Sequence, residues 1–126
     1  MASSPEEWLR QSDYDMDTAE YMLRGGRRFY AVFMCHLAVE KAAKGLYQRR
    51  LNRVPPRTHN LVYLLGQLGL RPPGELGVFL VSLNEAQIPT RYPEDLATLS
   101  QQYTEEVSRE MLRRGQEVLA WIKSQL

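Results

Sequence analysis

The sequence predicts an all-α protein: an up-and-down bundle of four main helices with one additional short helix. Apolar residues recur at steps of three and four along almost the whole chain, which is the spacing of one helix face. No segment shows the strict alternation of apolar and polar residues that indicates a half-buried strand. The length of 126 residues suits one domain over residues 1–126, large enough to bury a core without disulfides.

The first helix has a defined start and a defined end. Ser4, Pro5 and Glu7 supply an N-cap, a proline at the first helical position and a capping-box glutamate. The residues that follow on one face are Trp8, Ser12, Met16, Ala19 and Leu23. Gly25-Gly26 then ends the helix, because glycine readily takes the left-handed conformation found just past a helix end.

A second helix is expected from about residue 28 to residue 51, ahead of Pro55-Pro56. Its main apolar positions alternate steps of three and four in a heptad-like pattern, and they are Val32, Cys35, Val39, Ala42 and Leu46. Phe29, Phe33 and Ala43 widen this stripe. A stripe of that width predicts contacts with the protein's own core and with a partner helix.

Glycines and prolines divide the second half of the chain. A short helix is expected from Thr58 or His59 to about Gly69, and a fourth helix over residues 74–87. Residues 88–93 contain two prolines, each of which disfavours the α conformation in the residue before it, so we expect the helix to break there. The face of the last helix is expected to carry Tyr103, Val107, Met111, Arg114, Val118 and Trp121.

The net charge of +1 conceals a strong segregation of charge along the chain. Residues 1–20 hold six acids and one base, whereas residues 41–72 hold seven bases and no acid. Asp13, Asp15 and Asp17 lie two apart, which scatters them around a helix, so they are expected to be solvated. Lys41 and Lys44 begin the basic run, which indicates a phosphate-facing surface, a solvated face or a docking site for the acidic first helix of a partner chain.

Several classes of protein are excluded or disfavoured. The single cysteine, Cys35, rules out a disulfide framework and a cysteine-based zinc site; its place on the apolar stripe predicts an inert core residue in a reducing cytoplasm. No run approaches a membrane span, and residues 1–7 lack a signal-peptide layout. Gly25-Gly26 follows a helix instead of a strand, so phosphate-loop and dinucleotide-fold signals fail. We expect neither a metal nor a cofactor.

His59 is the first candidate functional residue. It follows a proline-rich loop and opens a helix, and helix N-termini favour anions. Arg53 and Arg57 lie close by in the sequence, which predicts a phosphate-sized pocket. The alternative is purely structural: Thr58 or Asn60 caps the helix and His59 packs against the second helix. The other histidine, His36, is expected to be partly buried or to lie in an interface.

The pair Arg91-Tyr92 is the second candidate, because it stands between two prolines in a rigid turn. Such a turn aims a guanidinium and a phenol at one site, although Arg–Tyr packing at the end of a bundle explains the pair equally well. The complete set of predicted ligand-binding residues is Lys41, Lys44, Arg53, Arg57, His59, Asn60, Arg91 and Tyr92.

Three segments resemble the HEPN domain, the higher eukaryotes and prokaryotes nucleotide-binding domain. They are residues 29–46 (FYAVFMCHLAVEKAAKGL), 58–61 (THNL) and 88–93 (IPTRYP). The stretch 38–44 (AVEKAAK) together with His59-Asn-Leu is the most specific part, and the Trp8, Asp15 and Ala19 pattern of the first helix fits as well. The resemblance covers almost the whole chain and is to the stand-alone prokaryotic type.

The resemblance implies a bundle of four or five helices that forms a homodimer. It also implies a partner, a minimal nucleotidyltransferase protein, in a toxin–antitoxin-like pair. Some members of the superfamily are metal-independent ribonucleases with an arginine, four to six residues, and then a histidine near the start of a late helix. This sequence departs from that motif, since no histidine follows His59, and the formally spaced Arg53 and His59 flank Pro55-Pro56 instead.

We therefore expect a binding module for a nucleotide or a nucleotidyltransferase partner. The first alternative is a ribonuclease toxin in which His59 moves the proton of the 2′-hydroxyl or of the leaving oxygen, while Arg53 and Arg91 stabilise the charge on phosphorus. The second alternative is a non-catalytic helical adaptor, in which the basic run makes dimer contacts.

Overall fold

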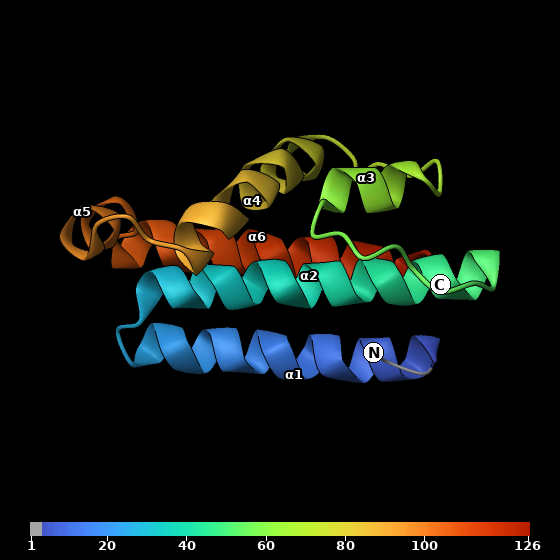
Figure 1. Cartoon of the computed structure of the whole chain (residues 1–126), viewed down its shortest axis with the longest axis horizontal. Coiled ribbons are helices and arrows are strands. Elements are labelled where there is room, and N and C mark those ends of the chain that lie inside the picture. Colours follow the sequence, from blue (N-terminus) through green and yellow to red (C-terminus); the bar gives the residue numbers. More distant parts are fainter. Residues whose placement is uncertain (1–3) are drawn as a thin grey trace.

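The computed structural model describes residues 4–126 and confirms the all-α fold. Its six helices are α1 (Pro5–Arg24), α2 (Arg28–Leu51), α3 (Leu61–Gly66), α4 (Glu75–Arg91), α5 (Leu96–Gln102) and α6 (Glu105–Ser124). Figure 1 shows α2 in the middle, antiparallel to α1 on one side, with α6 and α4 on the other. Because α2 contacts all five other helices, it is the central element of the bundle.

The start of α1 forms as predicted. The Ser4 Oγ accepts a hydrogen bond from the Glu7 amide at 3.1 Å, and Pro5 opens the helix. At the other end Gly26 has a φ of +79°, the left-handed conformation that favours glycine, and residues 25–27 turn the chain into α2.

The wide apolar stripe of α2 is buried within this chain, because α1 packs on one side of it and α6 and α4 on the other. Cys35 is fully buried and its thiol lies directly against Gly115 of α6, where any Cβ would clash with the sulfur. Burial raises the pKa of the Cys35 thiol to about 12, so the prediction of an inert core cysteine is confirmed.

Pro89 does not break the fourth helix, and the predicted end at residue 87 is wrong. α4 continues to Arg91, with the Thr90 hydroxyl donating to the Ala86 carbonyl at 2.7 Å and the Tyr92 amide donating to Ile88 at 2.9 Å. Proline removes one backbone donor, so the carbonyl of Glu85 loses its helical partner. Both Glu85 and Pro89 are exposed, so water can satisfy that carbonyl.

Two other boundaries differ from the prediction. One helix that was not predicted, α5, forms after Asp95, whose side chain accepts a hydrogen bond from the Thr98 amide. Tyr103 therefore ends α5, and α6 begins only after its N-cap, Thr104. The short α3 starts at Leu61 instead of Thr58 or His59, because Asn60 is its N-cap. His59 therefore belongs to the loop before α3.

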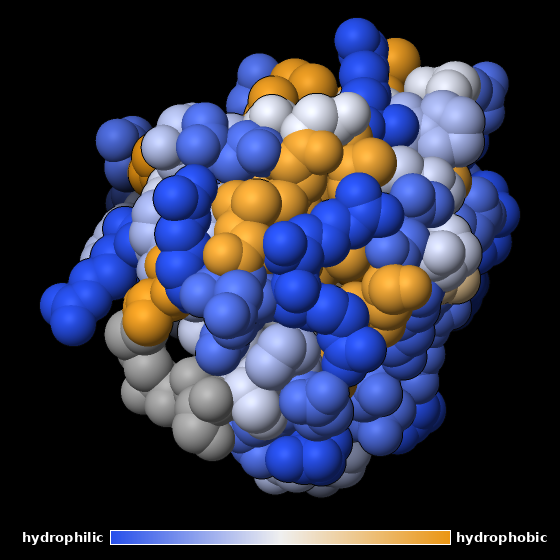
Figure 2. All heavy atoms as spheres, turned by 90° about the vertical axis from the view of Figure 1, so that its right-hand side faces the viewer, coloured by the Kyte–Doolittle hydropathy of each residue, from blue (hydrophilic) through white to orange (hydrophobic). Residues whose placement is uncertain are grey.

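None of the helices in the described part of the chain is long and apolar enough to cross a membrane. Figure 2 views the end of the bundle where α2 and α6 finish, and shows an apolar patch crossed by hydrophilic side chains. Val54 and Leu126, which follow those two helices, are exposed apolar residues.

Candidate functional site

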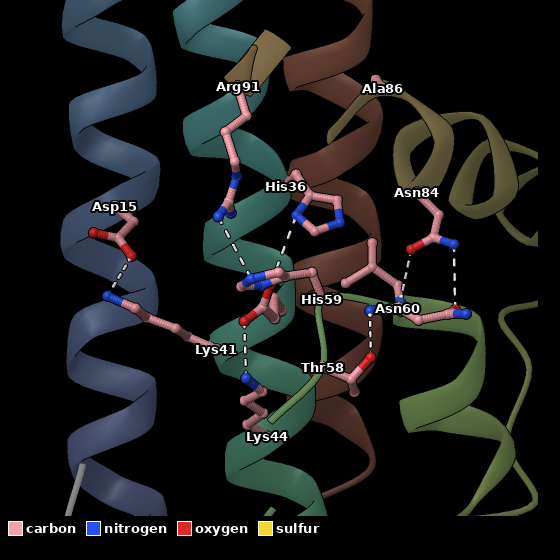
Figure 3. Close-up of polar contacts among 12 residues, drawn as sticks. Asp15, His36, Lys41, Lys44, Thr58, His59, Asn60, Asn84, Ala86 and Arg91 are labelled. Atoms are coloured by element: carbon pink, nitrogen blue, oxygen red, sulfur yellow. Dashed lines mark hydrogen bonds and ion pairs between the residues drawn. The ribbon is translucent and has the colours of Figure 1, made fainter. Parts of the chain in front are cut away.

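A buried carboxylate on α2 organises the site. Glu40 is only 3% exposed, and it binds two bases: its Oε2 lies 2.9 Å from Lys44 Nζ and its Oε1 lies 2.8 Å from His59 Nδ1. Figure 3 shows the two partners, Lys44 and His59, one above the other along α2. A buried charge is tolerated only when it is paired and hydrogen-bonded, so the two partners explain why this acid can lie in the core.

Sequence reasoning missed the role of Glu40. Its partner His59 is 19 residues away, and local spacing gives no information about that contact. A signal was nevertheless present, since His36, Glu40 and Lys44 follow one another at steps of four along a helix that is otherwise apolar on this side. A line of polar residues within a buried stripe indicates a polar site.

His59 presents one ring nitrogen outward. An ionised carboxylate only accepts hydrogen bonds, so His59 Nδ1 donates to Glu40. Nε2 is then an acceptor in the neutral ring and a second donor in the protonated ring. The side chain is 48% exposed, and Arg91 Nη1 lies 3.5 Å from Nε2. The contact with Glu40 therefore sets both the orientation and the tautomer of a half-exposed imidazole.

Arg91 reaches His59 from the last turn of α4. Its guanidinium carbon lies 4.9 Å from the centre of the Phe33 ring, a cation–π contact that holds the side chain over α2. The Nε of Arg91 is buried and has no hydrogen-bond partner among the described residues. The continuation of α4 through Pro89 is what brings this arginine to His59.

The loop that carries His59 is held by a small network of amides (Figure 3). Asn84 of α4 accepts from the Leu61 amide at 2.8 Å and donates to the Asn60 side chain at 3.2 Å. Asn60 caps α3 by accepting from Tyr63, and Thr58 accepts from the Asn60 amide. The capping role that we considered as an alternative is thus present, and it positions His59 at the same time.

His36, next to this cluster, is more deeply buried than the partly buried or interface position that we expected. It is 1% exposed, and its Nδ1 is 3.9 Å from Glu40 Oε1. Burial lowers the pKa of His36 to about 4, although the nearby Glu40 carboxylate opposes that shift. The ring is therefore neutral near pH 7.

A cavity of about 270 Å³ opens beside His59. Its lining residues are Trp8, Lys44, Pro55, Pro56, Arg57 and His59. Lys44 lies at the junction of the two features, because its Nζ binds Glu40 and stands 5.7 Å from the centre of the Trp8 ring. The cavity and the Glu40–His59–Arg91 cluster are consequently neighbours.

Part of the basic run is neutralised within the chain. Lys41 pairs with Asp15 at 2.9 Å, and Arg49 pairs with Glu6 at 2.6 Å. Asp15 is 6% exposed, so the expectation that it is solvated is wrong: α1 supplies it as the counter-charge for α2. The acidic first helix packs against the basic second helix of its own chain.

The structure brings together only part of the predicted set. His59 meets Arg91, and Lys44, Arg57 and His59 line one cavity. Arg53 instead donates to the Tyr47 hydroxyl at 3.3 Å. The remaining members lie elsewhere: Lys41 is turned toward α1, and Tyr92 is 71% exposed beside a separate hollow at the junction of α4 and α5.

Two absences complete the geometry of the site. Within residues 4–126, no carboxylate forms an ion pair with Arg53, Arg57 or Arg91. Over the same range, no three His, Cys, Asp or Glu side chains are grouped so as to hold a metal ion. The free cations of the site are thus guanidinium groups, which suit oxyanions.

These features define a class: a small all-α bundle in which a buried acid, paired with a lysine and a histidine, lies beside a cavity and near arginines without a partner acid. The family model of the HEPN domain matches residues 5–125, so the chain belongs to the HEPN domain family, as its sequence motifs indicated. A comparison with curated proteins finds no match.

Two solved structures are similar over nearly their full length. TT1696 from Thermus thermophilus shares 29% identity, covers 97% of this chain and 98% of its own, and has a TM-score of 0.85. ST0689, an archaeal HEPN homologue, shares 28% identity with 98% of both chains covered and a TM-score of 0.79. Both confirm the bundle as a whole.

Proposed function

We propose that this HEPN-domain protein is a binding module for a phosphate-bearing nucleotide, with His59 and Arg91 at the phosphate. The meeting of these two side chains carries the proposal. They come from a loop and from the far end of α4, and Glu40 and Phe33 hold them in place. Arg91 donates to a phosphate oxygen, and His59 Nε2 does so when its ring is protonated. Donors held in position by other side chains bind an oxyanion with little loss of entropy.

The charge balance of the cleft supports an anionic ligand. Lys44 offsets Glu40, which leaves the charges of Arg57 and Arg91 without a partner acid in the described chain. A phosphate monoester carries between about −1.5 and −2 charges at pH 7, so two guanidinium groups match it. We expect one phosphate group, and not a long polyanion, because Lys41 and Arg49 of the basic run are already paired with acids of α1.

Isothermal titration calorimetry with a panel of nucleotides tests this proposal. We expect Arg91→Gln to weaken nucleotide binding at least tenfold, about 1.4 kcal/mol. Arg109→Gln is the matched control, because Arg109 is an exposed arginine paired with Glu105 on α6. If the wild-type protein binds no nucleotide of the panel, the proposal is wrong.

Membership of the family also supports the finer parts of our prediction. We propose that the chain forms a homodimer, acts in the cytoplasm and partners a minimal nucleotidyltransferase protein in a toxin–antitoxin-like pair. Light scattering on the purified protein measures its mass against the 14.6 kDa of one chain. Co-purification with a neighbouring nucleotidyltransferase tests the partner. A protein that stays monomeric and captures no nucleotidyltransferase would contradict both the homodimer and the partner.

One observation favours cleavage of RNA as a second candidate function. The Glu40–His59 pair has the form of a catalytic dyad, in which a buried carboxylate orients an imidazole whose other nitrogen faces the cleft. Arg91 would stabilise charge on the reacting phosphate. Incubation with transfer RNA tests this candidate: cleavage that His59→Ala abolishes would establish it, and intact RNA would exclude it.

A further inference from the structure

The cavity beside His59 is the feature that phosphate binding alone leaves unexplained. Three of its lining residues, Trp8, Pro55 and Pro56, offer flat or rigid apolar surface. The polar groups of Lys44 and His59 lie where the cavity meets the Glu40–His59–Arg91 cluster. An inorganic phosphate has no apolar part that could contact these residues. The lining therefore indicates a ligand with an apolar part attached to its anionic part.

The size of the cavity limits that apolar part. Pockets that hold drug-sized ligands measure about 300–1,000 Å³. At about 270 Å³ the present cavity falls just below this range. It accordingly suits one ring system and is too small to enclose an entire nucleotide.

The position of the cavity relates the ring to the phosphate. His59 lines the cavity, and its Nε2 is 3.5 Å from Arg91 Nη1. A ligand whose phosphate is held by these two side chains can therefore reach the cavity with its other end. Aromatic and proline surfaces favour flat rings, and stacking of bases on such surfaces tolerates every base. Arg57 also lines the cavity and is exposed, so its guanidinium is available to a ligand there.

We infer that this cavity is the base subsite of a nucleoside monophosphate whose phosphate lies at His59 and Arg91. The inference rests on the proposed function and narrows it to a class of ligand. The ring contacts Trp8 and the two prolines, and the sugar spans the rim at Arg57. Neither inorganic phosphate nor a sugar phosphate satisfies both halves of the site.

Tryptophan fluorescence measures occupation of the cavity directly. The chain has two tryptophans, Trp8 in the cavity wall and Trp121 on α6, so Trp121→Phe leaves Trp8 as the sole emitter. The probes are adenosine 5′-monophosphate, uridine 5′-monophosphate, ribose 5-phosphate and inorganic phosphate. We expect at least one nucleotide to bind tenfold or more tightly than ribose 5-phosphate, and only nucleotides to change the Trp8 emission.

The outcomes separate this inference from the proposed function. Equal affinity for ribose 5-phosphate and for both nucleotides, with unchanged Trp8 emission, would overturn the base subsite while leaving the phosphate site in place. No calorimetric heat with any of the four probes would overturn both. Arg91→Gln adds a second check: it should weaken nucleotide and ribose 5-phosphate by the same factor, so that their ratio is preserved.

Discussion

The two basic regions of this protein differ in where their counter-charges lie. On the face between α1 and α2, Lys41 and Arg49 pair with acids of α1. In the cleft before α3, Arg57 and Arg91 have no such partner within residues 4–126. A run of bases in a sequence is thus no measure of a binding surface, because folding neutralises part of it and leaves the rest available.

The largest effect on stability should come from Glu40, the buried acid of the site. Glu40→Gln removes the charge that balances the buried Lys44, and breaking a buried pair typically costs about 3–5 kcal/mol. Urea denaturation measures the loss, with Glu117→Gln on the exposed face of α6 as the control, expected to cost less than about 1 kcal/mol. A loss below about 1 kcal/mol for Glu40→Gln would contradict the central role of this acid.

The next largest effect is a pH dependence due to His36. Its pKa falls from 6.5 in the unfolded chain to about 4 in the fold, so the unfolded state binds more protons between these values. The free energy of unfolding should therefore show no loss due to His36 above pH 6.5. It should decrease as the pH falls toward 4, by roughly 3 kcal/mol in all.

Denaturation curves from pH 7 to pH 4 measure this slope, and His36→Gln should flatten it. Because the comparison uses the slope, a variant of lower overall stability remains informative. A variant whose profile is parallel to that of the wild type would show that His36 does not cause the dependence.

A third pair of variants separates the two regions directly. Arg91→Gln should weaken nucleotide binding at least tenfold and leave stability within about 1 kcal/mol, because the guanidinium makes only a cation–π contact with Phe33 and a long, 3.5 Å contact with His59. Lys41→Gln should do the reverse: it leaves the charge of Asp15, which is 6% exposed, without its partner, while the nucleotide affinity stays unchanged. Calorimetry and denaturation on both variants measure the nucleotide affinity and the free energy of unfolding. A loss of nucleotide affinity in Lys41→Gln would show that the two basic regions do not differ in function.

The smallest effect is expected at Arg49. Its pair with Glu6 is exposed at both ends, with 42% and 57% of the side chains accessible, and such pairs contribute between about 0 and 1 kcal/mol. Arg49→Gln should leave both the melting temperature and the nucleotide affinity close to the wild-type values. A large change in either would show that this face has a function of its own.

Local signals predicted the parts of the fold that depend on neighbours in sequence. The cap at Ser4, the end at Gly25-Gly26 and the heptad-like stripe of α2 all involve residues within a few positions of one another. Pro89 misled the prediction because an exposed helix end tolerates a lost hydrogen bond, and α5 was missed because Asp95 caps a helix of only seven residues.

The site was predictable only in its components. His59 and Arg91 were identified as candidates from the residues around them, but their contact spans 32 residues and depends on α4 continuing past Pro89. Asp15 was expected in solvent because helix spacing alone does not show which face meets α2. Partners distant in sequence decide which charges are paired, and only the tertiary structure supplies them.

A crystal structure with bound adenosine 5′-monophosphate or uridine 5′-monophosphate, whichever binds more tightly, is the most direct test of the central claim. We expect phosphate oxygens within hydrogen-bond distance of Arg91 and His59, with the base in the cavity beside Trp8. A nucleotide bound instead on the α1–α2 face, at Lys41 or Arg49, would show that the paired bases, and not the unpaired arginines, form the binding surface.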